Sequence, residues 1–94
     1  MILIAAPKEN EWAALDIGMC AQNIMLSASA AGLCTCPVGL GKFIERTNLY
    51  SLLDIADADQ VLIGIALGYG AEKPKVPERK KENVFYVRHG VRGR

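Results

Sequence analysis

The feature that most constrains the fold is the stretch from Ile17 to Leu33, which carries no charged side chain. Its many Ala, Leu, Met and Ile residues favour a helix. Asn10 is a suitable N-cap ahead of it, and Gly32 stands where a glycine commonly ends a helix. The sequence therefore predicts one helix of about 20 residues that begins near Asn10 and ends near Ala31.

Apolar side chains lie on several faces of this helix. Leu15, Met19 and Leu26 share one stripe, whereas Ile17 and Ile24 lie on other faces. A helix that is apolar nearly all round must be covered on nearly all sides. Small residues along the helix allow another element to approach closely: Gly18, Ala21, Ala28 and Ala31. A chain of 94 residues is too short to cover such a helix alone, so we expect a second chain, or a further part of this one, to do so.

A membrane span is the alternative interpretation of the uncharged stretch. The stretch is at the lower limit of the length that spans a bilayer, contains polar residues such as Gln22 and Asn23, and has no Lys or Arg directly at its ends. We therefore expect a helix buried in protein and no membrane association. Residues 1–7 lack the basic start and the apolar length of a signal peptide. Together with an odd number of cysteines, this predicts a cytoplasmic location.

Charge and cysteine spacing exclude two further classes of function. Eleven Lys and Arg residues against ten Asp and Glu residues give a net charge of +1, which excludes a strongly basic nucleic-acid binder. Cys34 and Cys36 are closely spaced, but a four-ligand metal site would also need Cys20 or His89, which are distant in the sequence. We therefore expect no metal site and three buried, unreactive thiols.

Two apolar runs predict strands. Ile2–Ala5 is closed by Pro7, and Val61–Leu67 lacks any polar residue, which is typical of a central strand covered on both faces. The helix between them predicts a right-handed, parallel βαβ core over residues 1–70. Because a two-stranded parallel sheet is not stable alone, this α+β arrangement also looks like part of something larger.

The remaining segments have weaker patterns. Residues 32–41 (GLCTCPVGLG) predict a loop, and residues 43–53 predict one or two short helical turns. Residues 71–83 are charged and contain prolines, which predicts an extended, exposed segment. Val84–Val87 predicts a last short strand, and residues 88–94 a frayed basic end. Residues 71–94 together are expected to form a C-terminal tail.

Several motifs in this order resemble the C-terminal half of the FMN-dependent nitroreductase family. Residues 16–23 match a D-x-G-x-x-x-Q-N helix, and residues 32–39 are similar to a G-L-G-T-C-P-I-G loop. Residues 66–69 (ALGY) match a strand end, and Arg79 matches an arginine in a proline-rich tail. The resemblance runs from about Ile2 to about Val87. It implies a partial nitroreductase-like α+β fold in an obligate homodimer, with the long helix in the interface and one FMN at each end of it.

The resemblance also implies which residues bind FMN. Four consecutive residues match the segment whose backbone meets the edge of the flavin ring: Pro37, Val38, Gly39 and Leu40. Many relatives carry an acidic residue in place of Gly39 or Leu40, which leaves the backbone as the expected contact. Arg79 matches the tail arginine that pairs with the FMN phosphate, and Lys80 adds a positive charge beside it. No side chain is expected to be catalytic, because the flavin carries the electrons.

The implied function is an FMN-dependent oxidoreductase that passes reducing equivalents from NAD(P)H to nitro, quinone or similar acceptors. An R-R-S-x-R-like segment, which grips FMN in the family's N-terminal half, has no match in this chain. Three interpretations stay open. The chain is one half of an enzyme that works with an N-terminal partner chain, or a non-catalytic dimerisation and interaction module, or a decayed product without function.

Overall fold

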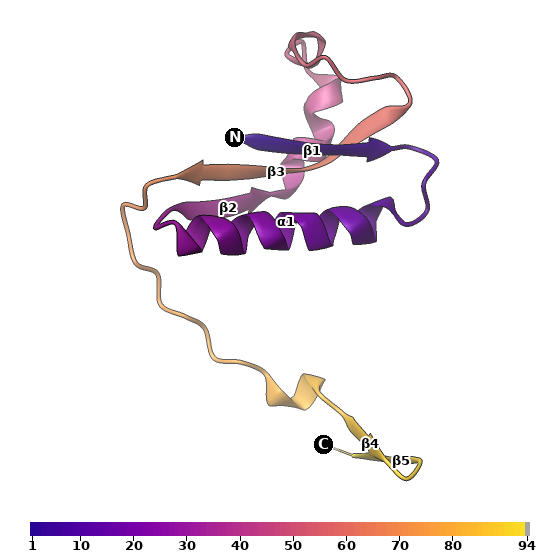
Figure 1. Ribbon diagram of the computed structural model, residues 1–94, viewed down its shortest axis with the longest axis vertical. Coiled ribbons are helices and arrows are strands. Elements are labelled where there is room, and N and C mark those ends of the chain that lie inside the picture. Colours follow the sequence, from indigo (N-terminus) through magenta and orange to yellow (C-terminus); the bar gives the residue numbers. More distant parts are fainter. Residues whose placement is uncertain (94) are drawn as a thin grey trace.

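The computed structural model describes residues 1–93, in which one long helix lies along a three-stranded sheet and a thin tail leads away from both (Figure 1). The chain mixes helix and strand, as the α+β class requires. In chain order the elements are β1 (Ile2–Pro7), α1 (Ala13–Ala30), β2 (Cys34–Val38), the 3-10 helices η1 (Gly39–Arg46) and η2 (Tyr50–Leu52), β3 (Asp59–Gly68), the 3-10 helix η3 (Lys81–Asn83), β4 (Tyr86–Arg88) and β5 (Val91–Gly93).

The sheet has the order β1–β3–β2, and β3 is antiparallel to both neighbours. The predicted parallel pairing of the first and last apolar runs is therefore wrong. Helix α1 does connect two parallel strands, but these are β1 and β2. Strand β3 lies between them in the sheet. The prediction of β3 as the central strand is confirmed.

Strand β2 lies inside the segment predicted to be a loop, so that prediction is also wrong. Its sequence, Cys-Thr-Cys-Pro-Val, is short and includes Pro37, which has no backbone N–H to donate to a neighbouring strand. Proline is tolerated at the edge of a sheet, and β2 is an edge strand. The predicted helical turns of residues 43–53 are confirmed as η1 and η2, although η1 begins earlier, at Gly39.

The C-terminal end of α1 is closed by a glycine, as predicted. Gly32 has φ = 81°, and its N–H donates to the carbonyl of Ser29 at 3.0 Å. The N–H of Leu33 donates to the carbonyl of Ala28 at 2.9 Å. These two bonds form the Schellman arrangement, which satisfies carbonyl groups that the helix leaves unpaired.

The N-terminal end of α1 differs from the prediction. Helix α1 starts at Ala13, with Trp12 as the residue before it. Asn10 instead forms a turn ahead of the helix, in which its side-chain oxygen accepts a hydrogen bond from the Trp12 N–H at 3.0 Å. Asn side chains commonly form such local turns with the backbone two residues on.

The core is small and lies where α1 meets the sheet. Helix α1 contacts all three strands, and the buried apolar residues are Ala13, Ile17, Ala21, Ala28, Val61 and Ile65. In the described part of the chain, Ile65 is the largest side chain that is fully buried. Ala21 and Ala28 are thus covered by elements of this chain. By contrast, a Cβ atom added at Gly18 would have no neighbouring atom within 4 Å.

Beyond β3 the chain leaves the sheet. Residues 69–90 are exposed, and Figure 1 shows the tail running away from the sheet and helix to the hairpin of β4 and β5. The radius of gyration is 17.6 Å, compared with about 12 Å for a compact chain of this length. His89 and Gly90 both have positive φ, as a tight two-residue hairpin turn requires.

The hairpin changes the prediction for the C-terminus. The strand predicted over residues 84–87 instead runs from Tyr86 to Arg88, as β4, and it pairs with a further strand, β5. The predicted fraying is wrong for residues 88–93, and Arg94 lies outside the described residues. Within residues 1–93, no helix has both the length and the apolar character needed to cross a membrane.

Candidate functional site

The four residues predicted to meet a flavin ring lie together where β2 passes into η1. Pro37 and Val38 are the last residues of β2, paired with Ile65 and Gly64 of β3. Gly39 and Leu40 are the first residues of η1. The side chain of Leu40 is 75% exposed, and Gly39 is exposed as well. We call residues 37–40 the junction segment.

Gly41 anchors the junction segment to the sheet. A Cβ atom added at Gly41 would lie 2.7 Å from the backbone nitrogen of Gly64 and 3.3 Å from its Cα atom. The main chain of η1 therefore rests directly on the main chain of β3, and only glycine permits that distance. Nothing lies within 4 Å of a Cβ atom at Gly39. The segment is held on one side by β3 and is open beside Gly39.

The start of η1 also leaves backbone donors unpaired within the helix. The first N–H groups of any helix have no acceptor in the preceding turn. Gly39 and Leu40 hold these positions in η1. A ligand that approaches the open side at Gly39 would meet backbone rather than side chain, which suits recognition through main-chain hydrogen bonds.

Two cations follow the junction segment and were missed by the sequence prediction. Lys42 places its Nζ atom 5.0 Å from the centre of the Phe43 ring, and Arg46 places its Cζ atom 4.9 Å from the same ring. Both distances are within the range of cation–π attraction. The sequence does contain a signal for this cluster, because two cationic residues four positions apart flank an aromatic residue. These cations add positive charge next to the junction segment.

Arg79 and Lys80 lie elsewhere. Both belong to the exposed, extended part of the tail, which Figure 1 shows leading away from β2, η1 and α1. Within one chain, the four residues of the junction segment lie together, but Arg79 and Lys80 lie away from them. These two residues can contact the same ligand as a junction segment only if the tail moves or if the ligand sits on another copy of the chain.

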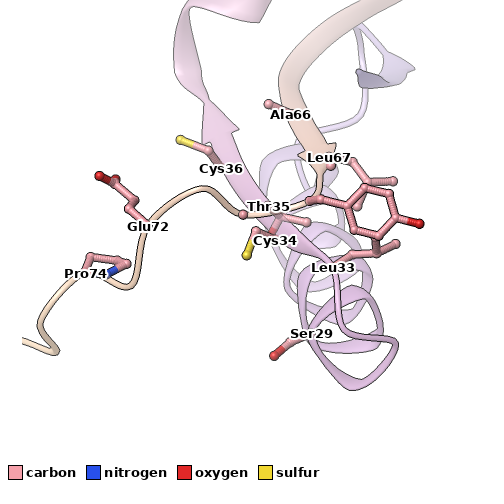
Figure 2. A pocket seen from close by; sticks show the side chains of 12 residues that line it. Ser29, Leu33, Cys34, Thr35, Cys36, Ala66, Leu67, Glu72 and Pro74 are labelled. Carbon is pink, nitrogen blue, oxygen red and sulfur yellow. The ribbon is translucent and has the colours of Figure 1, made fainter.

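An open hollow of about 500 Å³ lies at the other end of β2, between the ends of β2 and β3 and the first residues of the tail (Figure 2). Cys34, Cys36, Tyr69 and Glu72 are among its lining residues. All three cysteines of the chain are exposed, so the prediction of buried thiols is wrong. The two on β2 alternate with Thr35, which is half-buried, so they lie on the opposite, exposed face of the strand. Among residues 1–93, no group of three or more His, Cys, Asp or Glu side chains could hold a metal ion.

Helix α1 presents an apolar stripe to solvent. Leu15 is 58% exposed, Met19 is 55% exposed and Leu26 is 58% exposed. At 3.6 residues per turn, these three lie on nearly the opposite side of the helix from Ile17 and Ala21, which are buried. We call them the exposed stripe. The sequence-based expectation that something outside the core covers this face stays a prediction.

Comparisons with known proteins agree on one family. Residues 1–69 match the model of the Nitroreductase family. The chain is 34% identical over 70 residues to a 4-nitrobenzoate reductase of Pseudomonas putida, an alignment that covers 73% of this chain and 29% of that protein. It is 31% identical over 84 residues to a chloronitrobenzene nitroreductase of Comamonas testosteroni, covering 88% of this chain and 37% of that protein.

The alignments cover only part of each relative. The chain spans about a third of the length of these curated relatives. No solved structure matches it. The junction segment lies inside the part that matches the family model, whereas Arg79 and Lys80 lie beyond it.

Proposed function

This chain belongs to the nitroreductase family, and from that premise we propose that it forms part of an FMN-dependent oxidoreductase. The proposed reaction passes reducing equivalents from NAD(P)H to a nitroaromatic, quinone or similar acceptor. The names of the two relatives, which specify nitrobenzoate and chloronitrobenzene, support a nitroaromatic acceptor. The chain itself would supply the junction segment and the interface helix.

The observation that carries this proposal is the anchored but open junction segment. A flat aromatic ring system needs a backbone surface without side chains in the way, and the space beside Gly39 is free. The contact between Gly41 and Gly64 fixes this backbone against the central strand. When bound, FMN would supply the electron transfer. The junction segment would orient the edge of the ring through backbone N–H groups.

The phosphate of FMN requires positive charge. Arg79 provides a guanidinium that can bind phosphate through two hydrogen bonds, and Lys80 adds a second charge. Because the tail leads away from its own sheet (Figure 1), we propose that Arg79 and Lys80 reach the FMN bound by a second copy of the chain. This arrangement makes the site depend on assembly.

The exposed stripe supports a homodimer. Full burial of a Leu or Met side chain contributes about 1.5–3 kcal/mol. Because more than half of each stripe residue is exposed, covering it contributes about 1–2 kcal/mol per residue. A two-fold interface would bury Leu15, Met19 and Leu26 from both copies. A partner chain that carries the family's N-terminal half is the alternative cover for the same stripe.

A second candidate function is a non-catalytic interaction module. The observation in its favour is that a single chain keeps Arg79 and the junction segment apart while leaving the apolar stripe free. Such a module would associate through α1 without binding flavin.

One titration separates these functions. The purified chain is mixed with increasing FMN, and bound flavin is followed by fluorescence quenching while light scattering reports the assembly. We expect binding by the wild type and, for Arg79→Ala, an affinity lower by about tenfold to a hundredfold, since a hydrogen bond to a charged group contributes about 1.5–3 kcal/mol. Arg88→Ala, which removes another exposed arginine of the tail, is the control.

The possible outcomes have different meanings. Equal FMN affinities of the wild type and Arg79→Ala would contradict the phosphate role. A chain that dimerises but binds no FMN would contradict the flavin proposal and favour the interaction module. If FMN binds, oxidation of NADH or NADPH with 4-nitrobenzoate as acceptor then tests the proposed reaction.

A further inference from the structure

Helix η1 carries three side chains in a row along its exposed face: Leu40, Phe43 and Arg46. A 3-10 helix has three residues per turn, so residues three positions apart lie above one another. Gly41 and Ile44 lie on a second face and are half-buried, and Gly41 rests on β3. The row faces solvent, since Leu40 is 75% exposed and Phe43 is 38% exposed. It begins in the junction segment and leads away from it.

Two positive charges converge on the aromatic residue of this row. The Nζ atom of Lys42 lies 5.0 Å from the centre of the Phe43 ring, and the Cζ atom of Arg46 lies 4.9 Å from it. Both side chains are exposed. Within residues 1–93 neither forms an ion pair, not even with Glu45, the acid that stands between them on η1. Because like charges repel, an anion bound beside both would relieve this repulsion and gain two attractions.

The order of the side chains along η1 indicates the shape of that anion. Leu40 offers an apolar surface next to the junction segment, and the exposed part of Phe43 continues it. A guanidinium that lies over a ring keeps N–H groups free at its edge, where Arg46 can bind a carboxylate through two hydrogen bonds. Lys42 adds further donors. A planar ring that carries a carboxylate fits this order, because its ring covers the apolar surface while its carboxylate reaches the cations.

We propose that Leu40, Lys42, Phe43 and Arg46 form a subsite for an aromatic carboxylate. That this carboxylate is the electron acceptor rests on the proposed function, in which the adjoining junction segment meets the edge of the FMN ring. The subsite then makes the protein prefer acceptors with a carboxylate over neutral acceptors with the same ring. Lys42 and Arg46 determine specificity and carry no chemical step.

The test compares 4-nitrobenzoate with nitrobenzene, which lacks the carboxylate. Binding of each to the full-length chain is measured without flavin, by NMR titration of the ligand signals. Lys42→Gln and Arg46→Gln should each weaken 4-nitrobenzoate binding by about threefold to tenfold, because each removes one charged contact at an exposed site. Neither variant should alter nitrobenzene binding. Arg46→Lys keeps the charge and should lose less than Arg46→Gln.

Two more variants separate the ring from the charges. Phe43→Leu removes the aromatic surface and should weaken the binding of both ligands. Lys73→Gln removes an exposed cation of the tail and should bind both ligands as the wild type does. Because Lys42, Phe43 and Arg46 are all exposed, these variants are expected to fold, and circular dichroism checks this.

A second measurement distinguishes this proposal from the proposed function. In the flavin-loaded protein, the ratio of kcat/KM for 4-nitrobenzoate to kcat/KM for nitrobenzene should fall in Lys42→Gln and Arg46→Gln, whereas the affinity for FMN should not. A chain that binds no FMN, yet loses 4-nitrobenzoate binding in these variants as expected, would support the subsite and contradict the flavin function.

Other outcomes would overturn the subsite. One is equal affinity of the wild type for 4-nitrobenzoate and nitrobenzene, and another is an unchanged 4-nitrobenzoate affinity in both glutamine variants. If the variants instead lose activity with NADPH relative to NADH, with the preference between acceptors unaltered, the two cations bind a phosphate of the nicotinamide cofactor and the proposal is wrong.

Discussion

Replacement of Gly41 by alanine tests how the junction segment is held. The new Cβ atom would lie 2.7 Å from the nitrogen of Gly64 and 3.3 Å from the carbonyl carbon of Ile63. Non-bonded carbon atoms pack at about 3.5–4.0 Å, so η1 and β3 must separate by roughly 1 Å. The obstructing atoms are backbone and cannot rotate away. Moreover, Gly64 precedes Ile65, which is fully buried.

The expected cost follows from that contact. Overpacking typically destabilises a protein by about 1–3 kcal/mol, and we expect Gly41→Ala in the upper half of this range because the central strand must move. For a domain of this size, each kcal/mol lowers Tm by about 4–8 °C. The measurement is urea unfolding followed by far-ultraviolet circular dichroism at matched chain concentration.

Two other glycines of the same region provide controls. Gly39→Ala meets no atom within 4 Å and should change the free energy of unfolding by less than about 1 kcal/mol. Gly64→Ala meets the ends of Leu3 and Met1, at 3.2 Å each, and these flexible side chains can shift. The expected order of destabilisation is Gly41, then Gly64, then Gly39. Equal unfolding midpoints for Gly41→Ala and Gly39→Ala would refute the idea that η1 rests on β3.

Three further predictions concern α1 and its C-terminal end. Met19→Lys and Leu26→Lys should shift the assembly toward monomer in light scattering while leaving the helical signal intact. Ala21→Glu should instead unfold the chain, because that residue is 3% exposed and its charge would be buried without a partner; a folded monomeric Ala21→Glu variant would contradict this. Gly32→Ala should cost about 1–2 kcal/mol of unfolding free energy, because φ at this position is 81°, and an unchanged urea midpoint would exclude the proposed helix end.

The sequence predicted the elements whose signals are local. The helix end at Gly32 depends on a few neighbouring residues, and β3 is one continuous apolar run. Pairing direction is not local, since a strand buried on both faces is apolar whether its neighbours run parallel or antiparallel. Strand β2 was missed because five residues with Pro37 carry no alternating pattern.

The same distinction applies to the candidate site. Residues 37–40 are consecutive, so the chain itself keeps them together. The separation of Arg79 from them depends on the path of the tail, and a charged segment without apolar positions gives no signal for that path. The exposure of Cys34 and Cys36 depends on which face of β2 is covered, and residues 34–38 carry no alternating pattern that shows this face.

The strand order also fixes the sequence of events during synthesis. The central strand, β3, is the last of the three to leave the ribosome, and β1 and β2 pair with β3 but not with each other. Until Asp59–Gly68 emerges, both earlier strands lack their hydrogen-bonding partner and α1 has no sheet to pack against. Until β3 is made, the nascent chain therefore exposes an apolar helix and two unpaired strands, which are the features that make folding intermediates prone to aggregate.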